Sequence, residues 1–345
     1  MIIKRLPTNW VYGCLLSVLT ILAMVSLTSG AMPISVSDSF KGIIPGLGTL
    51  PGHIELIIRD IRLPRTLLCL TVGAILSTSG AMMQTLFRNP LAEPGIIGVS
   101  GGAALGAALT MVYYASFPGF NPDFVLFGPV PFFAFVGAAL TTLLVYRIGR
   151  TPYGHSVPVM LLAGIAVSAL SGAILGVTHY IADDQTLRDI TMWTMGSLAA
   201  ADWDSVVLAT TTLLVIGTLS FRWRQSLNTF LLGEGDAEYA GVRVSALKRG
   251  VILTVAAGVG VAVSLCGIIG FVGLVIPHIS RMLCGPDHRV LLPVSAIGGA
   301  AILLAADILA RTLVAPAEMP VGIITALLGG PFFVWLLIQQ KGRIL

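Results

Sequence analysis

Two charged residues stand close together in an otherwise apolar stretch of this 345-residue sequence, and they are the first candidates for chemistry. Asp307 precedes Arg311 by four residues, a spacing that places both side chains on one face of a helix. An acid inside a membrane is costly and is often retained because it relays protons or ions. A charge pair at a helix end is more typical of a structural or interfacial role, and we favour that interpretation over a proton relay.

Other reactive residue types lack the spacing that catalysis or metal binding requires. The five histidines are scattered along the chain: His53, His155, His179, His278 and His288. The four cysteines are interpreted as small apolar packing residues: Cys14, Cys69, Cys266 and Cys284. The sequence has no HExxH, GxxxxGK[ST] or CxxCH motif. We therefore predict no catalytic residue, no metal site, no bound cofactor and no ATP hydrolysis by this chain.

The elements that position these residues are predicted to be membrane helices. Only 10% of the residues are charged, 56% are hydrophobic and the mean hydropathy is +0.93, whereas a soluble protein has about 25% charged residues. A helix needs roughly 20 apolar residues to span a bilayer. The apolar runs do not alternate as the strands of a membrane β-barrel would. Ten such stretches lie near 12–31, 64–86, 95–115, 126–147, 159–181, 205–221, 249–267, 269–284, 290–312 and 322–340.

The distribution of basic residues predicts which way the chain faces. The first stretch follows Lys4 and Arg5 as a signal peptide would, but its length and the lack of a cleavage site favour an uncleaved span. Ten spans put both termini on one side, and the positive-inside rule places them in the cytoplasm. The net charge of +4 follows from the loops, and no basic patch with interleaved aromatic residues indicates nucleic-acid binding. In this arrangement six of the 20 Lys and Arg residues lie outside: Lys41, Arg59, Arg62, Arg65, Arg188 and Arg311.

The predicted fold is all-α, a single transmembrane domain over residues 1–345. Spans two to five and seven to ten each contain four helices but begin on opposite sides of the membrane, which is the layout of an inverted repeat. Gly/Pro-rich signatures at Asn89–Gly102 and Gly270–His278 hint at the same relationship. Three connections are long: the outer segments Met32–Leu63, with a short amphipathic stretch at His53–Asp60, and Ala182–Asp204, which is predicted to form a surface helix, and the polar cytoplasmic segment 222–249.

The chain resembles the permease subunits of bacterial ABC importers for iron chelates, haem and vitamin B12. The resemblance covers nearly everything after the first span. It rests on RLPRTLLCLTVGAILSTSGAMMQTLFRNPLAEPGIIGVSGGAALGA (Arg62–Ala107), LLGEGDAEYAGV (Leu231–Val242), GIIGFVGLVIPHISRML (Gly267–Leu283), GPDHRVLLP (Gly285–Pro293), and ADILAR with AEMPVGIITALLGGPFFVWLL (Ala306–Leu337). It implies a homodimer in the bacterial inner membrane, two cytoplasmic ATP-binding-cassette subunits that hold ATP and Mg, and a periplasmic substrate-binding protein.

The resemblance also assigns roles to two sets of residues at the membrane faces. The cytoplasmic set looks like the family's coupling helices, which contact the ATPase, although a solvated loop is the alternative: Gly233, Glu234, Ala237, Tyr239 and Gly241. On the outer side Arg62, Arg65 and Arg311 match positions where the vitamin B12 permease receives glutamates of its binding protein. Guanidinium groups suit such bidentate pairing. Alternatively, Arg311 neutralises Asp307 and Arg62 anchors a helix end.

By the same resemblance the pathway lies on the dimer axis and is lined mainly by the fifth span, the start of the outer helix that follows it and parts of the tenth span. Ser156, Val157 and Pro158 are the expected cytoplasmic gate, although Val157 and Pro158 depart from the small polar residues of the B12 permease. Further along the helix the expected pathway residues are Ser168, Gly172, Gly176 and His179.

The favoured substrate is haem, with vitamin B12 and ferric siderophores as alternatives, because LRDITMWTMGSL (Leu187–Leu198) is nearer to the haem permeases. His179 and Met192 or Met195 have side chains that can ligate haem iron, but packing is the simpler interpretation. Two other classes stay open. A secondary transporter would run on an ion gradient without an ATPase, and an intramembrane enzyme would need paired reactive groups that the spans do not show.

Overall fold

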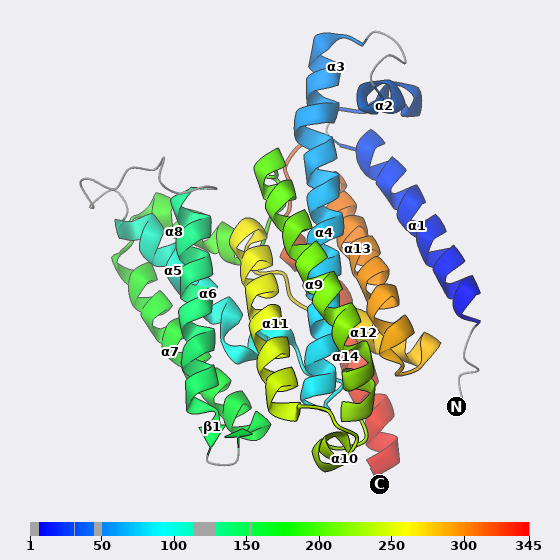
Figure 1. The fold of residues 1–345 in the computed structure, drawn as a ribbon. Helices are drawn as coiled ribbons and strands as arrows, with labels where there is room; N and C mark the ends of the chain where they lie inside the picture. Colours follow the sequence, from blue (N-terminus) through cyan, green and yellow to red (C-terminus); the bar gives the residue numbers. More distant parts are fainter. Residues whose placement is uncertain (1–6, 31, 45–49, 114–127, 152–153, 345) are drawn as a thin grey trace.

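The computed structural model describes residues 7–30, 32–44, 50–113, 128–151 and 154–344, with side chains through Gln339. The described chain is helical apart from one small hairpin (Figure 1). The elements are α1 (Thr8–Thr28), α2 (Val36–Ile43), α3 (Gly52–Leu56), the π-helical η1 (Ile57–Arg62), α4 (Leu63–Leu86), the 3₁₀ turn η2 (Pro94–Ile97), α5 (Val99–Tyr113), α6 (Pro129–Ile148), β1 (Arg150–Thr151), β2 (Gly154–His155), α7 (Val157–Ile181), α8 (Asp184–Thr194), α9 (Trp203–Phe230), α10 (Glu234–Tyr239), α11 (Val244–Cys266), α12 (Val272–Cys284), α13 (His288–Thr312) and α14 (Val321–Ile344).

The predicted all-α membrane fold is confirmed. Within the described chain, eight helices are long and apolar enough to cross a bilayer. They are α1, α4, α6, α7, α9, α11, α13 and α14, and each covers one predicted span. The two remaining predicted spans are occupied by α5 and α12, which are apolar but shorter. About ten apolar helices therefore build the domain.

The two short helices occupy corresponding positions in the two sets of four helices, α4–α7 and α11–α14. Each begins after irregular backbone, because Gly98 before α5 and Gly267 and Phe271 before α12 have positive φ. Phe271, at φ 68°, is unusual, since a non-glycine residue rarely adopts this conformation. Interrupted helices at matching positions are what an inverted repeat predicts.

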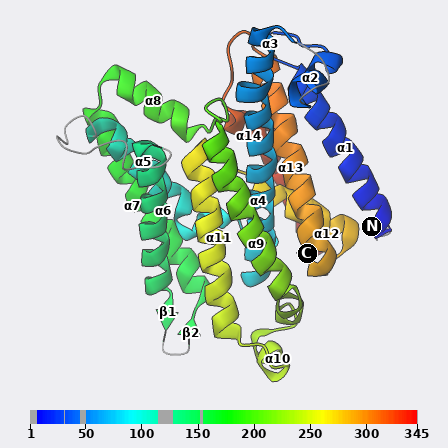
Figure 2. The same cartoon turned by 45° about the horizontal axis from the view of Figure 1, so that its top comes forward.

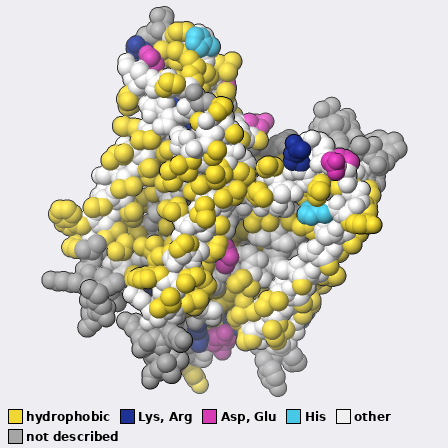
Figure 3. Space-filling model, turned by 180° about the vertical axis from the view of Figure 1, so that it is seen from behind, with side chains coloured by type: hydrophobic (Ala, Val, Ile, Leu, Met, Phe, Trp, Pro, Cys, Tyr) yellow, Lys and Arg dark blue, Asp and Glu magenta, His cyan; other side chains and the backbone are white. Residues whose placement is uncertain are grey.

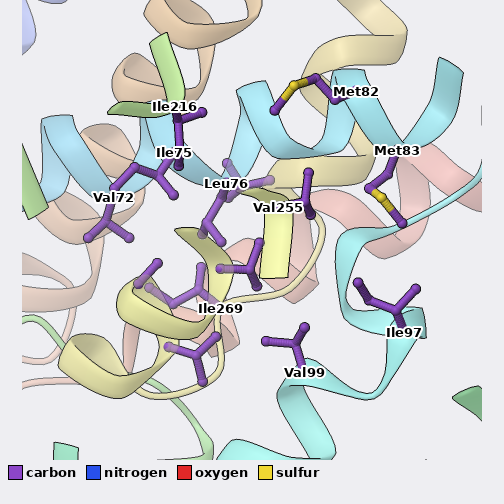
Figure 4. Packing of buried hydrophobic residues seen from close by; sticks show 14 of the residues in the cluster. Val72, Ile75, Leu76, Met82, Met83, Ile97, Val99, Ile216, Val255 and Ile269 are labelled. Carbon is purple, nitrogen blue, oxygen red and sulfur yellow. The ribbon is translucent and has the colours of Figure 1, made fainter. Parts of the chain in front are cut away.

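Helix α4 forms the centre of the bundle, and almost every residue from Pro64 to Leu86 is buried. Its apolar side chains meet those of α9, α11 and the irregular segments next to α5 and α12 (Figure 4). Two glycine positions bring backbones together, since a Cβ at Gly73 would overlap the carbonyl of Gly299 and one at Gly80 that of Gly273. Small residues allow such close helix packing without a hydrophobic driving force from water.

The polar connections are more helical than the sequence pattern indicates. The amphipathic stretch at 53–60 is not separate but continues through α3 and η1 into α4 as one rod, Gly52–Leu86. The surface helix predicted within 182–204 is present as α8. On the other side, α9 continues past residue 221 to Phe230 and α11 already starts at Val244. The predicted boundaries followed the first charged residue, but a helix ends where its last turn is capped, not where its side chains turn polar.

The elements of the two polar faces gather at opposite ends of the molecule. Helices α2, α3 and α8 lie at one end, while α10 and the β1–β2 hairpin lie at the other, and both views agree on this (Figures 1 and 2). The surface between them is mostly hydrophobic on the face shown in Figure 3, with few charged side chains. This division gives the site residues described below two separate locations along the helix axes.

Candidate functional site

Arg65 forms the centre of a charged cluster at the N-terminal end of α4, on the side that the sequence predicts to be outside; we call it the outer cluster. Its Nε lies 3.0 Å from Asp307 Oδ1, its Nη2 lies 2.8 Å from the same oxygen, and its Nη1 lies 2.8 Å from Glu318 Oε2. The side chain of Asp307 is fully buried, whereas that of Glu318 is 45% exposed. Arg65 therefore joins α4 to α13 and to the connection that follows α13.

Arg311 and Arg62 complete this outer cluster by holding the end of α1. Arg311 Nη2 donates to Ser26 O at 2.9 Å and to Ser26 Oγ at 2.6 Å. Its Nε lies 3.4 Å from Asp307 Oδ2, an ion-pair distance without the alignment of a hydrogen bond. Arg62 Nη1 donates to Leu27 O at 2.7 Å, and Nη2 donates to the carbonyl of Met32.

The structure thus brings the three predicted docking arginines together, but with their guanidinium groups turned inward. Arg62, Arg65 and Arg311 are only 4%, 6% and 5% exposed. Each donates hydrogen bonds to groups of this chain. This arrangement is the one expected if the arginines neutralise Asp307 and anchor helix ends. Sequence reasoning did not single out Arg188, which is exposed on α8 at the same end of the molecule. Its position in the predicted surface helix before α9 could have indicated that it is exposed.

The predicted coupling residues lie on and around α10. Gly233 and Gly241 flank the helix with φ of 146° and 85°, a region that favours glycine, and so they set the turns into and out of it. Ala237 is fully buried and fixes the helix to the bundle. Tyr239 on the opposite side is 95% exposed. Helix α10 is therefore packed against the bundle through Ala237 and exposes Tyr239 on its other side.

Lys248, which sequence reasoning missed, connects α10 to the residues before the predicted gate. Its Nζ lies 2.6 Å from Glu234 Oε2 and donates to His155 O at 3.2 Å. Although it carries a charge, Lys248 is buried. A lysine near the start of a long apolar helix is expected to be buried there, and a buried lysine needs a partner. This requirement was the signal in the sequence.

The β1–β2 hairpin holds the start of α7. Arg150 pairs with His155 and Thr151 with Gly154, and Ser156 N donates to Gly149 O at 3.0 Å. The His155 ring stacks on Tyr146 with centroids 4.0 Å apart. Burial, followed by the charges of Arg150, Lys248 and Arg249, lowers the pKa of His155 below its ordinary value of 6.5.

The predicted gate and pathway residues follow directly along α7. Ser156 is the N-cap residue, and Val157 and Pro158 open the helix, where proline is well tolerated. Gly172 and Gly176 are exposed with open space where a Cβ would stand. Ser168 is half-buried on the same helical face, and His179 Nε2 is buried without a hydrogen-bond partner in the described part of the chain. The face they share is therefore open at Gly172 and Gly176 and partly covered at its two ends.

No group of three or more metal-binding side chains forms among the described residues. The haem ligands considered from the sequence lie on separate elements: His179 on α7 and Met192 on α8, with Met195 just after α8. Met192 is 52% exposed and Met195 is 38% exposed. Ligation by these residues stays a hypothesis.

Glu93 is a further residue that sequence reasoning missed. Its Oε1 accepts a hydrogen bond of 3.2 Å from Phe271 N, and in this way it connects the two Gly/Pro-rich signatures. Among the described residues no Lys, Arg or His nitrogen lies within ion-pair distance of this carboxylate. The signal was its position as the acidic residue of the NPLAEPG sequence, next to the break before α5.

Comparisons with known proteins agree over nearly the whole chain. Residues 18–339 match the FecCD transport family. The chain is 44% identical to the hemin transport system permease protein HmuU of Yersinia pestis over 337 residues, covering 98% of both chains. It is 40% identical to the vitamin B12 import system permease protein BtuC of Klebsiella pneumoniae, covering 99% of this chain and 96% of the relative. A solved inward-facing structure of a metal-chelate-type ABC transporter matches with a TM-score of 0.80 at 33% identity, covering 96% of this chain and 99% of that one.

Proposed function

Because this chain belongs to the FecCD transport family, we propose that it is the permease subunit of an ATP-driven importer and that its substrate is haem. The observation that carries the choice of haem is the end-to-end similarity to a hemin permease. Import of vitamin B12 by the same mechanism is the second candidate, since the B12 permease matches over an equal length. Ferric siderophores are the third, on the basis of the metal-chelate transporter.

The chain is a multi-pass membrane protein that acts as a transport subunit. The proposal adds that ATP and Mg bind to a separate ATPase subunit, since no GxxxxGK[ST] loop occurs in this sequence. It also places the protein in the bacterial inner membrane with both termini in the cytoplasm, on the side of α10. The excess of Lys and Arg in the segments on that side supports this orientation.

We further propose that a second copy of the chain completes the pathway. Gly172 and Gly176 lie on an exposed apolar face of α7, and a Cβ at either position would meet open space, so no side chain fills the volume in front of this face. Two copies that turn this face toward a common axis would form a passage lined by Ser168, Gly172, Gly176 and His179. Few strong binding groups would line it, and a large ligand would then be released readily.

Two ATPase subunits would contact α10, and the route from α10 to the gate is short. A movement of α10 would pull on Glu234, whose carboxylate is bound to Lys248. Lys248 in turn holds the carbonyl of His155, the residue directly before Ser156. Rigid-body motion of this kind is a common way to transmit a conformational change, and here it would reach Ser156, Val157 and Pro158.

On the outer side, the binding protein would dock over α8 and the outer ends of α4 and α13. Arg188 offers an exposed guanidinium there, while Arg62, Arg65 and Arg311 need to exchange partners to reach a docked carboxylate. These three arginines could therefore take part in docking only if the hydrogen bonds and ion pairs of the outer cluster rearrange. Exposed acidic residues on α8 would set the salt dependence of the encounter.

The decisive experiment reconstitutes this permease with its ATPase and binding protein in proteoliposomes and compares uptake of haem, cobalamin and a ferric siderophore. Haem uptake that needs ATP and stops with vanadate supports the proposal. Uptake of cobalamin alone would shift the assignment to the second candidate. Uptake that follows an ion gradient in the absence of ATP would show a secondary transporter and would overturn the importer class.

A further inference from the structure

A groove lies between α9 and the start of α13, toward the end of α9 that contacts α10. Its volume is 680 Å³. Apolar side chains from both helices form its walls, among them Leu213, Leu214, Leu292 and Ala296. Leu214 and Phe221 at its rim are 66% and 63% exposed, so the groove opens on the outside of the bundle, where a membrane would lie.

The groove ends in two arginines. Arg224 on α9 and Arg289 at the start of α13 both line it. Arg224 is held over the Phe221 ring with its Cζ 3.7 Å from the ring centroid. In the described part of the chain no carboxylate oxygen lies within 4.0 Å of either guanidinium. The nearby Asp287 carboxylate already accepts from Asn228 Nδ2 at 2.7 Å and from Arg289 N at 2.9 Å.

Hydrogen bonds join the end of α9 and the start of α13, the two segments that carry the arginines. Asn228 Oδ1 accepts from His288 N at 2.9 Å and lies 2.6 Å from His288 Nδ1, which ties the end of α9 to the start of α13. Arg224 precedes Asn228 by four residues and so shares its helical face, and Arg289 follows His288. The charged end is therefore built into the junction of the two helices.

The length of the groove matches one leaflet of a bilayer. Arg224 follows Leu213 by eleven positions, which at the rise of an α-helix is about 16.5 Å. Half of the hydrocarbon core is about 15 Å thick. Gly217 lies between these two levels, and a Cβ there would meet open space, so the absence of a side chain keeps the groove free. Its buried floor includes Thr78, whose Oγ1 has no hydrogen-bond partner among the described residues.

We propose that this groove is a binding site for an anionic phospholipid, with the phosphate at Arg224 and Arg289 and one acyl chain along Leu213, Leu214 and Leu292. Basic pockets between membrane helices on the cytoplasmic side bind anionic head groups. The cytoplasmic location rests on the proposed orientation of the chain. A lipid bound here would bridge α9 and α13 close to the start of α10 and would stabilise their junction.

The test uses the purified full-length chain, with native mass spectrometry of bound lipid after exchange from nanodiscs of phosphatidylglycerol or phosphatidylcholine. The wild type is expected to retain phosphatidylglycerol preferentially. Removing one charge should weaken this retention about fivefold, and Arg224→Gln with Arg289→Gln about 25-fold. Arg222→Gln is the matched control, because Arg222 is exposed on the same helix but does not line the groove.

A second variant tests the acyl-chain part of the site while both arginines stay. Gly217→Phe should abolish retention by filling the groove, while Gly13→Phe, at another glycine with open space around it, should not. The proposal is overturned if the double arginine variant keeps the preference, if phosphatidylcholine binds equally well, or if millimolar inorganic phosphate displaces the lipid. Neither the orientation nor haem uptake enters this measurement, so its failure and that of the proposed function are separable.

Discussion

Glu234 and Lys248 form an ion pair of 2.6 Å in which the lysine side chain is 8% exposed and the glutamate side chain is 46% exposed. The asymmetry matters because only the lysine depends on its partner. The ammonium group has left water and is satisfied by Glu234 and by the carbonyl of His155. The carboxylate, in contrast, keeps contact with solvent. This ion pair therefore connects the surface helix α10 to a buried residue of α11.

Replacing Lys248 with Met should uncouple ATP hydrolysis from uptake. The apolar stem keeps its packing and Glu234 remains solvated, so the protein should fold, but α10 loses its connection to His155. We expect uptake in proteoliposomes to fall about tenfold, equivalent to about 1.4 kcal/mol in the activation free energy, with ATP hydrolysis retained. Lys248→Arg, which keeps the charge, should be much less affected. Uptake by Lys248→Met at the wild-type rate would remove the proposed route.

Gly241 gives a second test of coupling, based on backbone conformation. Its φ of 85° is strained for any residue with a side chain, although there is open space around it. Gly241→Ile should shift α10 by changing the turn, at a cost of about 1–3 kcal/mol, and reduce uptake per ATP hydrolysed without affecting membrane insertion. Gly235→Ile is the matched control, since Gly235 also has open space and lacks a positive φ. Equal effects from both would show that contact with the ATPase, and not the turn, is responsible.

We expect substitutions of the buried Arg65 and of the exposed Arg188 to have opposite effects on stability and on docking. Arg65→Met leaves the buried Asp307 carboxylate without its strongest partner, and losing one member of a buried pair costs about 3–5 kcal/mol. The midpoint temperature of thermal unfolding in detergent should therefore fall markedly. Arg188→Glu should leave stability within about 0.5 kcal/mol but weaken docking of the binding protein and make the remainder more sensitive to salt. A stable Arg65→Met variant with weakened docking would instead show that Arg65 serves the binding protein directly.

The hairpin before the gate should weaken in acid because of His155. Its pKa is lowered in the folded protein, so folding favours the neutral ring. This contribution to stability is present above the unfolded pKa of about 6.5 and is lost as the pH falls below that value. Thermal stability of the wild type should therefore decline more steeply between pH 7 and 5 than that of His155→Gln. Parallel curves for the two proteins would contradict the assignment.

The sequence predicted the elements well because membrane helices leave a strong local signal. Runs of about 20 apolar residues are hard to mistake, and all ten predicted stretches coincide with helices of the structure. The start of α7 was predicted two residues late, because the predicted span began after Pro158, although proline is well tolerated in the first turn of a helix.

Contacts between elements were not predictable in the same way. Lys248 meets the carbonyl of a residue 93 positions away, and Phe271 meets Glu93 across 178 positions. A hydropathy pattern indicates that a helix exists but not which helices face each other. The inward orientation of the outer arginines follows from Ser26, Asp307 and Glu318, whose closeness to one another depends on packing around α4.

The glycine contacts of α4 have a consequence for how the transporter changes shape. At Gly73–Gly299 and Gly80–Gly273 backbone rests on backbone, so no side chain can change rotamer to absorb sliding. A shift by one residue would drive a neighbouring Cβ into a carbonyl oxygen. We therefore expect α4, α12 and α13 to behave as a single stiff strut, with the Arg65 cluster at one end and Gln84, bonded to Arg281, at the other. The movement that opens the passage first to one side of the membrane and then to the other would then fall to the helices outside this strut.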